Sequence, residues 1–225
     1  MADEGLVGLL VGVGASAGGL EALLALVAGL DEDLPAALFV VLHQAPTAPT
    51  VLPGLLARRC RLPVEGVRDG APVRPGRVVV ARPDHHLLVR DAHVVLGRGP
   101  REDGHRPGVD SLFRSLAQEA GPRAVGVVLS GMLDDGAAGM LEIVRHGGSA
   151  VVQEPTEAGR DSMPRAALAR VPGAIVTPAH AVGAVLRELV ASAPSAGAAP
   201  AHDLRSLLAG DARRCGPEES GSGRP

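Results

Sequence analysis

Apolar residues in this chain fall into short continuous runs, separated by longer segments with an apolar residue at every third or fourth position. Continuous runs are typical of strands buried on both faces, and the longer segments are typical of helices with one buried face. Their alternation predicts an α/β fold built on a mostly parallel sheet. The predicted strands are residues 6–13, 37–42, 125–130, 149–153 and 174–176, and the predicted helices are residues 18–29, 51–60 and 137–146, one that opens at Asp110, and one that ends near Val190.

The middle of the chain breaks this alternation. Three short runs, 77–81, 86–89 and 93–96, follow closely on one another, and only Arg90-Asp91-Ala92 separates the last two. That spacing predicts a β-hairpin, either as an antiparallel excursion from the sheet or at its edge. A polar, glycine-rich loop at 97–109 follows, and loops of this length inside a domain are usually functional or mobile.

Composition sets the domain organisation. The 225 residues are 46% hydrophobic but only 1% aromatic, so the core consists of Leu, Val, Ala and Ile. We assign residues 1–190 to one domain, whose first strand begins within a few residues of Met1. From Ala191 on, the chain is rich in Ala, Pro, Gly and Ser, so residues 191–225 are predicted to be a largely disordered tail.

Charge and cysteine usage exclude several classes of protein. The net charge is −3, there is no basic run and bases have few aromatic rings to stack on, so we expect no nucleic-acid partner. Cys60 and Cys215 are two isolated thiols, which indicates a reducing compartment. No signal peptide and no apolar stretch long enough to span a bilayer is present, so we predict a soluble cytoplasmic protein without membrane insertion.

The segment from Leu9 to Leu20 carries the first candidate for chemistry. An apolar run breaks at glycines, places Ser16 at the break and continues with helical periodicity. Gly14-Ala-Ser-Ala-Gly18 fits the G-x-S-x-G nucleophile elbow, a sharp turn between strand and helix that exposes a serine. The same letters fit the dinucleotide fingerprint as Gly12-x-Gly14-x-x-Ala17, and a plain turn with a helix-capping serine also explains them.

Three polar residues each follow the carboxyl end of a predicted strand: Ser16, His43 and Asp135. Ligands of open parallel sheets bind at that edge, where strand ends that are distant in sequence converge. We expect Ser16 to attack a carbonyl carbon, His43 to transfer its proton, and Asp135 to orient the imidazole. The amino end of the helix after Asp135 would keep it ionised, and the backbone N–H of Ala17 would bind the oxyanion.

The second strand end also bears on the rival interpretations. A dinucleotide-binding fold places an acidic residue there, whereas this chain has the base His43. The order Ser, His, Asp differs from that of α/β-hydrolases, so that fold is not assigned. Five further residues suggest metal binding but lack ligand spacing, so no metal site is predicted. These are Asp84, His85, His86, His93 and His105.

At these positions the chain resembles the catalytic domain of the CheB-type protein-glutamate methylesterases, which act on chemotaxis receptors. The matching segments run in order over about residues 6–190. They are residues 14–19, His43 with Pro46, and residues 74–81, 105–113, 126–140 and 163–165.

The resemblance implies a doubly wound, Rossmann-like three-layer domain with an antiparallel hairpin. It places the triad on Ser16, His43 and Asp135, and the backbone of Met132 beside Ala17 at the oxyanion. It implies hydrolysis of glutamyl methyl esters and deamidation of glutamines without a cofactor. The expected partners are the methylated cytoplasmic domain of a chemoreceptor and a separate receiver or methyltransferase protein, because the chain leaves no room for a receiver domain before its first strand.

Two departures from the family pattern stand beside the expected site. The family commonly has Thr where this chain has Ala17, and Asn where it has Asp134. We expect the added carboxylate of Asp134 to raise the pKa of one of the two adjacent aspartates and to lower activity.

Overall fold

The computed structural model describes residues 8–193, so the predicted tail lies outside the described residues from position 194 on. The strands are β1 (Leu9–Ala15), β2 (Ala36–Leu42), β3 (Val64–Gly66), β4 (Arg77–Val80), β5 (His86–Arg90), β6 (His93–Gly97), β7 (Ala124–Val128), β8 (Ser149–Gln153) and β9 (Ile175–Thr177). The α-helices are α1 (Gly19–Ala28), α2 (Leu52–Ala57), α3 (Val109–Ala120), α4 (Ala137–Arg145), α5 (Ser162–Arg170) and α6 (Val182–Ser192).

Seven of these strands form one parallel sheet in the order β3-β4-β2-β1-β7-β8-β9. The chain builds outward from β1 to one side and then returns to build outward from β7 on the other. The sheet is therefore doubly wound, as predicted, and its order reverses between β1 and β7, which lie side by side. In sheets of this kind the ligand site lies outside the carboxyl ends of the strands at that reversal.

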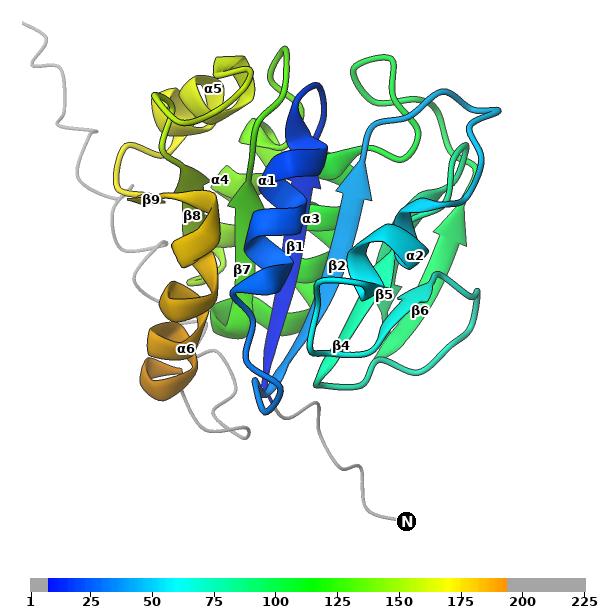
Figure 1. The fold of residues 1–225 in the computed structure, drawn as a ribbon, viewed down its shortest axis with the longest axis horizontal. Coiled ribbons are helices and arrows are strands. Elements are labelled where there is room, and N and C mark those ends of the chain that lie inside the picture. Colours follow the sequence, from blue (N-terminus) through cyan, green and yellow to red (C-terminus); the bar gives the residue numbers. More distant parts are fainter. Residues whose placement is uncertain (1–7, 194–225) are drawn as a thin grey trace, which may run out of the picture.

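Helices cover both faces of the sheet, which gives the predicted three layers. Figure 1 shows α1 and α6 in front of the sheet and α3 behind it. Along β1, odd-numbered residues such as Val11 and Val13 pack on the α1 side, and even-numbered Leu10 packs on the α3 side. Both faces of the strand are buried, which is why β1 reads as one apolar run rather than as an alternation.

The predicted hairpin is confirmed, but its surroundings differ from the prediction. β5 and β6 form a separate two-stranded antiparallel sheet that packs on α3, where the Val89 amide donates to Ser115 Oγ at 3.1 Å. β4 instead joins the parallel sheet between β2 and β3. The short β3 was not predicted, because its three half-buried residues carry no apolar run.

Other boundaries also differ from the prediction. β1 runs from Leu9 to Ala15, past the predicted end at residue 13, so Gly12 and Gly14 lie inside the strand and not in a turn. The first two predicted positions of this strand, 6 and 7, lie outside the described residues. Helix α2 ends at Ala57, short of the predicted residue 60. Among the described residues, no helix combines the length and hydrophobicity that crossing a bilayer requires.

The contact between α6 and the end of α1 gives a test of the packing. A Cβ added at Gly183 would lie 2.0 Å from the backbone oxygen of Gly29, whereas one at Gly173 would meet nothing within 4 Å. We expect Gly183→Ala to lower the free energy of unfolding by about 1–3 kcal/mol in urea titrations. Gly173→Ala is the control and should stay within about 0.5 kcal/mol of wild type. Equal stability of both variants would contradict this packing.

Candidate active site

Ser16 and His43 follow neighbouring strands of the parallel sheet. The last register pair of β1 and β2 is Ala15 with Leu42, and the His43 amide donates to Ala15 O at 3.0 Å. On the other side of β1, the Ser16 amide donates to Ser130 O at 2.9 Å. Adjacent strands lie about 4.8 Å apart, so Ser16 stands between His43 and Ser130 at one edge of the sheet.

The turn after Ser16 is as tight as a nucleophile elbow requires. Gly18 has φ +71°, and the Gly19 amide donates to Ser16 O at 2.9 Å as α1 begins. A Cβ at Gly18 would lie 2.9 Å from Ser130 Oγ, so a side chain there is excluded both by backbone conformation and by space. Ser16 itself is half-buried.

The glycines before the turn have a different purpose. A Cβ at Gly12 would lie 2.8 Å from the Phe113 ring, and one at Gly14 would lie 2.3 Å from Val109 Cγ1. Both glycines therefore let α3 pack closely on β1. They do not line a loop that receives a phosphate group, which removes the main support for the dinucleotide interpretation.

Ser130 fixes this turn and was missed by the sequence reasoning. Its hydroxyl donates to Ala17 O and accepts from the Arg160 amide, both at 2.9 Å, and its own amide donates to Gln153 Oε1 at 2.8 Å. Ser130 is fully buried, and the bond from its amide to Gln153 is buried with it. The signal in the sequence was a serine directly after the buried run of β7.

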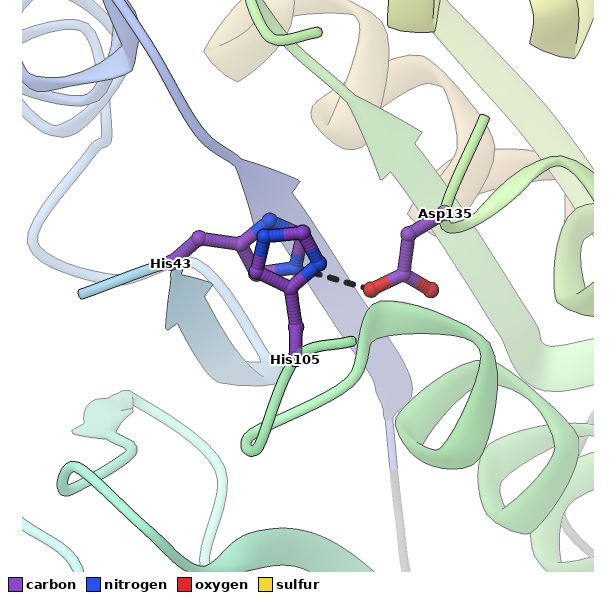
Figure 2. A group of neighbouring side chains, drawn as sticks. All are labelled: His43, His105 and Asp135. Carbon is purple, nitrogen blue, oxygen red and sulfur yellow. Dashed lines mark hydrogen bonds and ion pairs between the residues drawn. The ribbon is translucent and has the colours of Figure 1, made fainter. Parts of the chain in front are cut away.

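His43 and Asp135 form a direct hydrogen bond. Nε2 of His43 lies 2.8 Å from Oδ2 of Asp135, and the two side chains are only 4% and 1% exposed. Figure 2 shows the imidazole and the carboxylate facing each other across the edge of the sheet. The other ring nitrogen of His43, Nδ1, is buried and has no hydrogen-bond partner among residues 8–193.

Asp135 is held by the amino end of α3, not by that of the helix that follows it. The amides of Val109 and Asp110 each donate to its carboxylate at 2.8 Å. The prediction assigned the stabilisation of the ionised Asp135 to the amino end of α4, whereas the amides that bind its carboxylate come from α3. The amides at the start of α4, those of Gly136 and Gly139, donate instead to Oδ1 of Asp110, at 2.9 and 2.7 Å.

Asp135 and Asp110 differ in pKa. Burial raises the pKa of Asp135, but the hydrogen bonds from His43, Val109 and Asp110 lower it by more, so its net pKa lies below the usual range. Burial is also the main influence on Asp110 and raises its pKa to about 6. Because the net pKa of Asp135 is lowered, the predicted increase is not met at Asp135, and the Asp134 side chain is exposed.

His105 is the second residue that the sequence reasoning missed as part of the site. Its ring stacks on that of His43, with centroids 3.7 Å apart and planes 7° apart (Figure 2). Burial and the neighbouring His43 lower the pKa of His105, which favours its neutral form. Its only signal was the motif from 105 to 113, because the loop that brings it to His43 has no regular pattern.

The predicted oxyanion residues lie at the same edge. The amides of Ala17 and Met132 donate to no acceptor within the described part of the chain. A Cβ at Gly131, the residue before Met132, would lie 3.0 Å from Ser16 Cβ, which places this loop against the serine. The Met132 side chain is 51% exposed.

The same cluster must be considered as a metal site. His43, His105 and Asp135 each offer one ligand atom within 4.8 Å of the others. A metal ion binds an imidazole nitrogen in the plane of the ring, and one ion cannot lie in both planes of a stacked pair. Asp103, Asp110 and Asp135 form a second group, but three of the oxygens of Asp110 and Asp135 already accept backbone amides. The donor set fits hydrogen bonding better than coordination.

Comparisons with known proteins agree on one family. Residues 11–186 match the CheB methylesterase family. A protein-glutamate methylesterase/protein-glutamine glutaminase of Anaeromyxobacter dehalogenans is 42% identical over 164 residues, covering 69% of this chain and 44% of that protein. One from Yersinia pestis is 41% identical, covering 71% of this chain and 47% of that protein. The chain thus spans about half the length of the curated relatives it matches.

A solved structure matches the fold. The crystal structure of the Thermotoga maritima CheB methylesterase catalytic domain superposes with a TM-score of 0.77 at 28% sequence identity. The match covers 81% of this chain and 99% of that chain.

The raised pKa of Asp110 gives a pH test. A carboxyl whose pKa is about 6 when folded and about 4 when unfolded contributes stability that is complete below about pH 4 and lost as the pH rises through 6. Asp110→Asn keeps an oxygen for the Gly136 and Gly139 amides but does not titrate. Relative to wild type, we expect its free energy of unfolding to rise by about 2–3 kcal/mol between pH 4 and pH 7 in urea titrations. A pH-independent difference between the proteins would contradict the assignment.

The stacked ring gives a second test. His105→Phe keeps a flat ring against His43, and His105→Ala removes it. We expect labelling of Ser16 by a fluorophosphonate to slow by about tenfold or more in the Ala variant, because His43 loses its support, and by less than about threefold in the Phe variant. Thermal melting checks that both variants fold. Equal labelling rates for Ala and Phe would show that the ring does not position His43.

Proposed function

The chain belongs to the CheB methylesterase family, and from this premise we propose that it is a serine hydrolase acting on chemoreceptor-type proteins. It cleaves methyl esters of glutamyl side chains and deamidates glutamines, as the names of its relatives state for those proteins. The observation that carries the proposal is the buried His43–Asp135 hydrogen bond beside Ser16. The substrate is the methylated cytoplasmic domain of a receptor, which places the reaction in the cytoplasm.

His43 acts as the general base through Nδ1. Because the pKa of Asp135 is lowered, its carboxylate is ionised near neutral pH and accepts a hydrogen bond from the N–H at Nε2 of His43. The neutral imidazole then carries its lone pair on Nδ1, the buried atom without a partner among the described residues. Hydrogen bonds between nucleophile and base often close only when substrate binds.

The reaction proceeds in two halves. Ser16 Oγ attacks the ester carbonyl as its proton moves to Nδ1 of His43, and that proton then passes to the departing methanol. Water attacks the resulting glutamyl-serine ester with the same base and returns free glutamate and Ser16. For glutamine the leaving group is ammonia. The developing oxyanion accepts hydrogen bonds from the amides of Ala17 and Met132.

The turn is supported although Ala17 lacks the hydroxyl of the threonine that the family commonly has at this position. Ser130 Oγ already donates to Ala17 O at 2.9 Å from the adjacent strand. The elbow is therefore fixed by the sheet rather than by the side chain at position 17, and the oxyanion donors keep their place.

Substitutions at the two adjacent aspartates test the proposal. Asp135→Asn keeps the shape of the side chain, but its amide donor favours the wrong imidazole tautomer, so we expect methanol release from a methylated receptor fragment to fall about 10⁴-fold. Ser16→Ala should abolish the covalent step. Asp134→Asn is the matched control: the Asp134 side chain is exposed, and we expect less than about a twofold change. If Asp135→Asn retained wild-type activity, the assignment of the triad would be refuted.

A further inference from the structure

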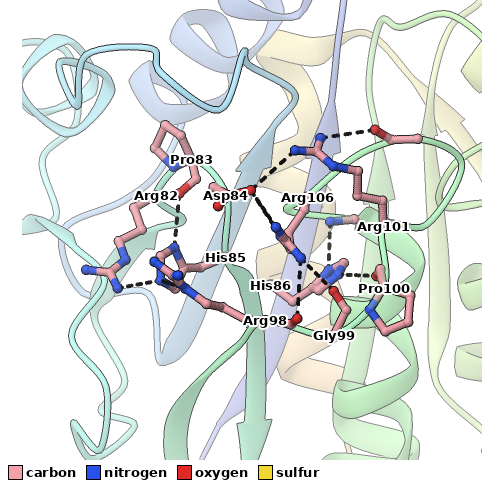
Figure 3. A network of polar contacts seen from close by, with 12 residues as sticks. Arg82, Pro83, Asp84, His85, His86, Arg98, Gly99, Pro100, Arg101 and Arg106 are labelled. Carbon is pink, nitrogen blue, oxygen red and sulfur yellow. Dashed lines mark hydrogen bonds and ion pairs between the residues drawn. The ribbon is translucent and has the colours of Figure 1, made fainter.

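Four arginines gather on two loops beside the His43–His105 pair, and we call them the arginine cluster. Arg82 lies in the loop after β4, and Arg98, Arg101 and Arg106 lie in the loop before α3. Figure 3 shows their guanidinium groups around Asp84 and His85. Three of the four side chains are exposed, and Arg106 is 19% exposed.

The arginine cluster lies at the same edge of the sheet as Ser16. Strand β4 pairs with β2, and the Ala81 amide continues this pairing by donating to Val40 O at 2.9 Å. The two arginine-bearing loops are joined where the Asp84 amide donates to Arg106 O at 3.0 Å. Arg106 directly follows His105, whose ring stacks on His43. The cluster therefore borders the site on the β4 side.

Within the described residues, a single carboxylate forms ion pairs with the arginine cluster, and it pairs with two of the four arginines. Asp84 Oδ1 accepts from Arg106 at 2.7 Å and from Arg101 at 3.3 Å. The acids nearby in the loop, Glu102 and Asp103, form no ion pair with the cluster in the described part of the chain, and Glu102 pairs instead with Arg114. Positive charge is thus concentrated here in a chain whose net charge is −3.

Arg82 and Arg98 are arranged unusually. Both donate to the same atom, Nε2 of His85, at 2.7 and 3.0 Å, while Nδ1 of His85 donates to Pro83 O at 3.1 Å. Nε2 accepts from both guanidinium groups, and an imidazole offers no negative charge, so His85 does not charge-balance either guanidinium. Two like charges are held together at the surface, and each has further N–H groups to offer to an anion.

Several other arginines of the described chain pair with acids. Arg145 pairs with Glu142 at 2.8 Å, and Arg187 pairs with Asp33 at 2.8 Å. Arg82 and Arg98 differ from these: an imidazole orients both of them, and neither forms an ion pair with a carboxylate of the described chain. The planar fork of a guanidinium group suits the bidentate geometry of carboxylates.

We propose that the arginine cluster binds carboxylate side chains of the protein substrate that flank the target glutamyl ester. This inference rests on the proposed function. The ester itself is neutral and offers no charge to recognise, so an electrostatic contribution must come from acidic neighbours on the substrate surface. A charged patch beside the reacting group steers association and fixes orientation without taking part in the chemistry.

The experiment compares two charge-matched double variants. Arg82→Gln/Arg98→Gln removes the unpaired arginines, and Arg58→Gln/Arg59→Gln removes two exposed arginines after α2. The control pair is at the opposite edge of the sheet, near Arg61, which pairs with Asp31 in the loop between α1 and β2. Each protein is assayed for methanol release from a methylated receptor fragment and for hydrolysis of the small neutral ester p-nitrophenyl acetate.

We expect Arg82→Gln/Arg98→Gln to lower kcat/KM on the receptor fragment by about tenfold at low salt, mainly through KM, with a weaker dependence on ionic strength than wild type. Hydrolysis of p-nitrophenyl acetate and both activities of Arg58→Gln/Arg59→Gln should stay close to wild type. An unchanged KM on the receptor fragment would overturn the proposal. So would an equal loss on the small ester, because it would mean that the loops had been disrupted.

A binding measurement separates this proposal from the proposed function. Ser16→Ala protein is titrated with a fluorescent glutamate-rich peptide, followed by anisotropy, with and without the Arg82→Gln/Arg98→Gln change. Salt-sensitive binding that requires the two arginines supports the docking surface even if wild-type protein releases no methanol, an outcome that would defeat the hydrolase proposal alone. No binding of the peptide, or tighter binding of a matched phosphopeptide, would reject acidic side chains as the ligand.

Discussion

At the centre of this site, two buried aspartates each accept hydrogen bonds from the amino end of a helix that the other aspartate begins or precedes. Asp135, which precedes α4, accepts the first amides of α3, and Asp110, in the first turn of α3, accepts the first amides of α4. Each carboxylate satisfies amide groups that a helix end leaves unpaired, and each is stabilised by the positive end of the other helix. The arrangement locks α3 and α4 together beneath the carboxyl edge of the sheet.

The charge on Asp135 follows from these hydrogen bonds. A carboxylate that is 1% exposed would ordinarily take up a proton, yet its pKa is lowered because two amides and His43 bind its charged form. An ionised Asp135 favours a proton on Nε2 of His43, and the His105 ring stacks on one face of the His43 imidazole. The base of the proposed reaction therefore depends on the packing of two helices as much as on the triad residues.

Local pattern was enough to predict most of the strands, although β1 and β7 end two residues away from the predicted positions. Ser16, His43 and Asp135 were proposed as site residues because buried parallel strands read as apolar runs and their carboxyl ends share an edge. The amides that bind Asp135 come from a helix other than the predicted one, because tertiary packing sets which helix end faces a carboxylate. The contacts of His105 with His43 and of Ser130 with Ala17 were missed for the same reason, because tertiary packing brings these segments together. Gly12 and Gly14 matched the phosphate-loop pattern because the sequence does not distinguish a glycine that lets a helix pack closely from one that lets a ligand approach the backbone.

The most direct test of this account is the tautomer of His43, measured by nitrogen NMR of histidine-labelled protein at neutral pH. We expect a proton on Nε2, hydrogen-bonded to Asp135, and an unprotonated Nδ1 that is available to Ser16. A neutral ring with its proton on Nδ1 would contradict the account, because the imidazole would then have no lone pair with which to accept the serine proton.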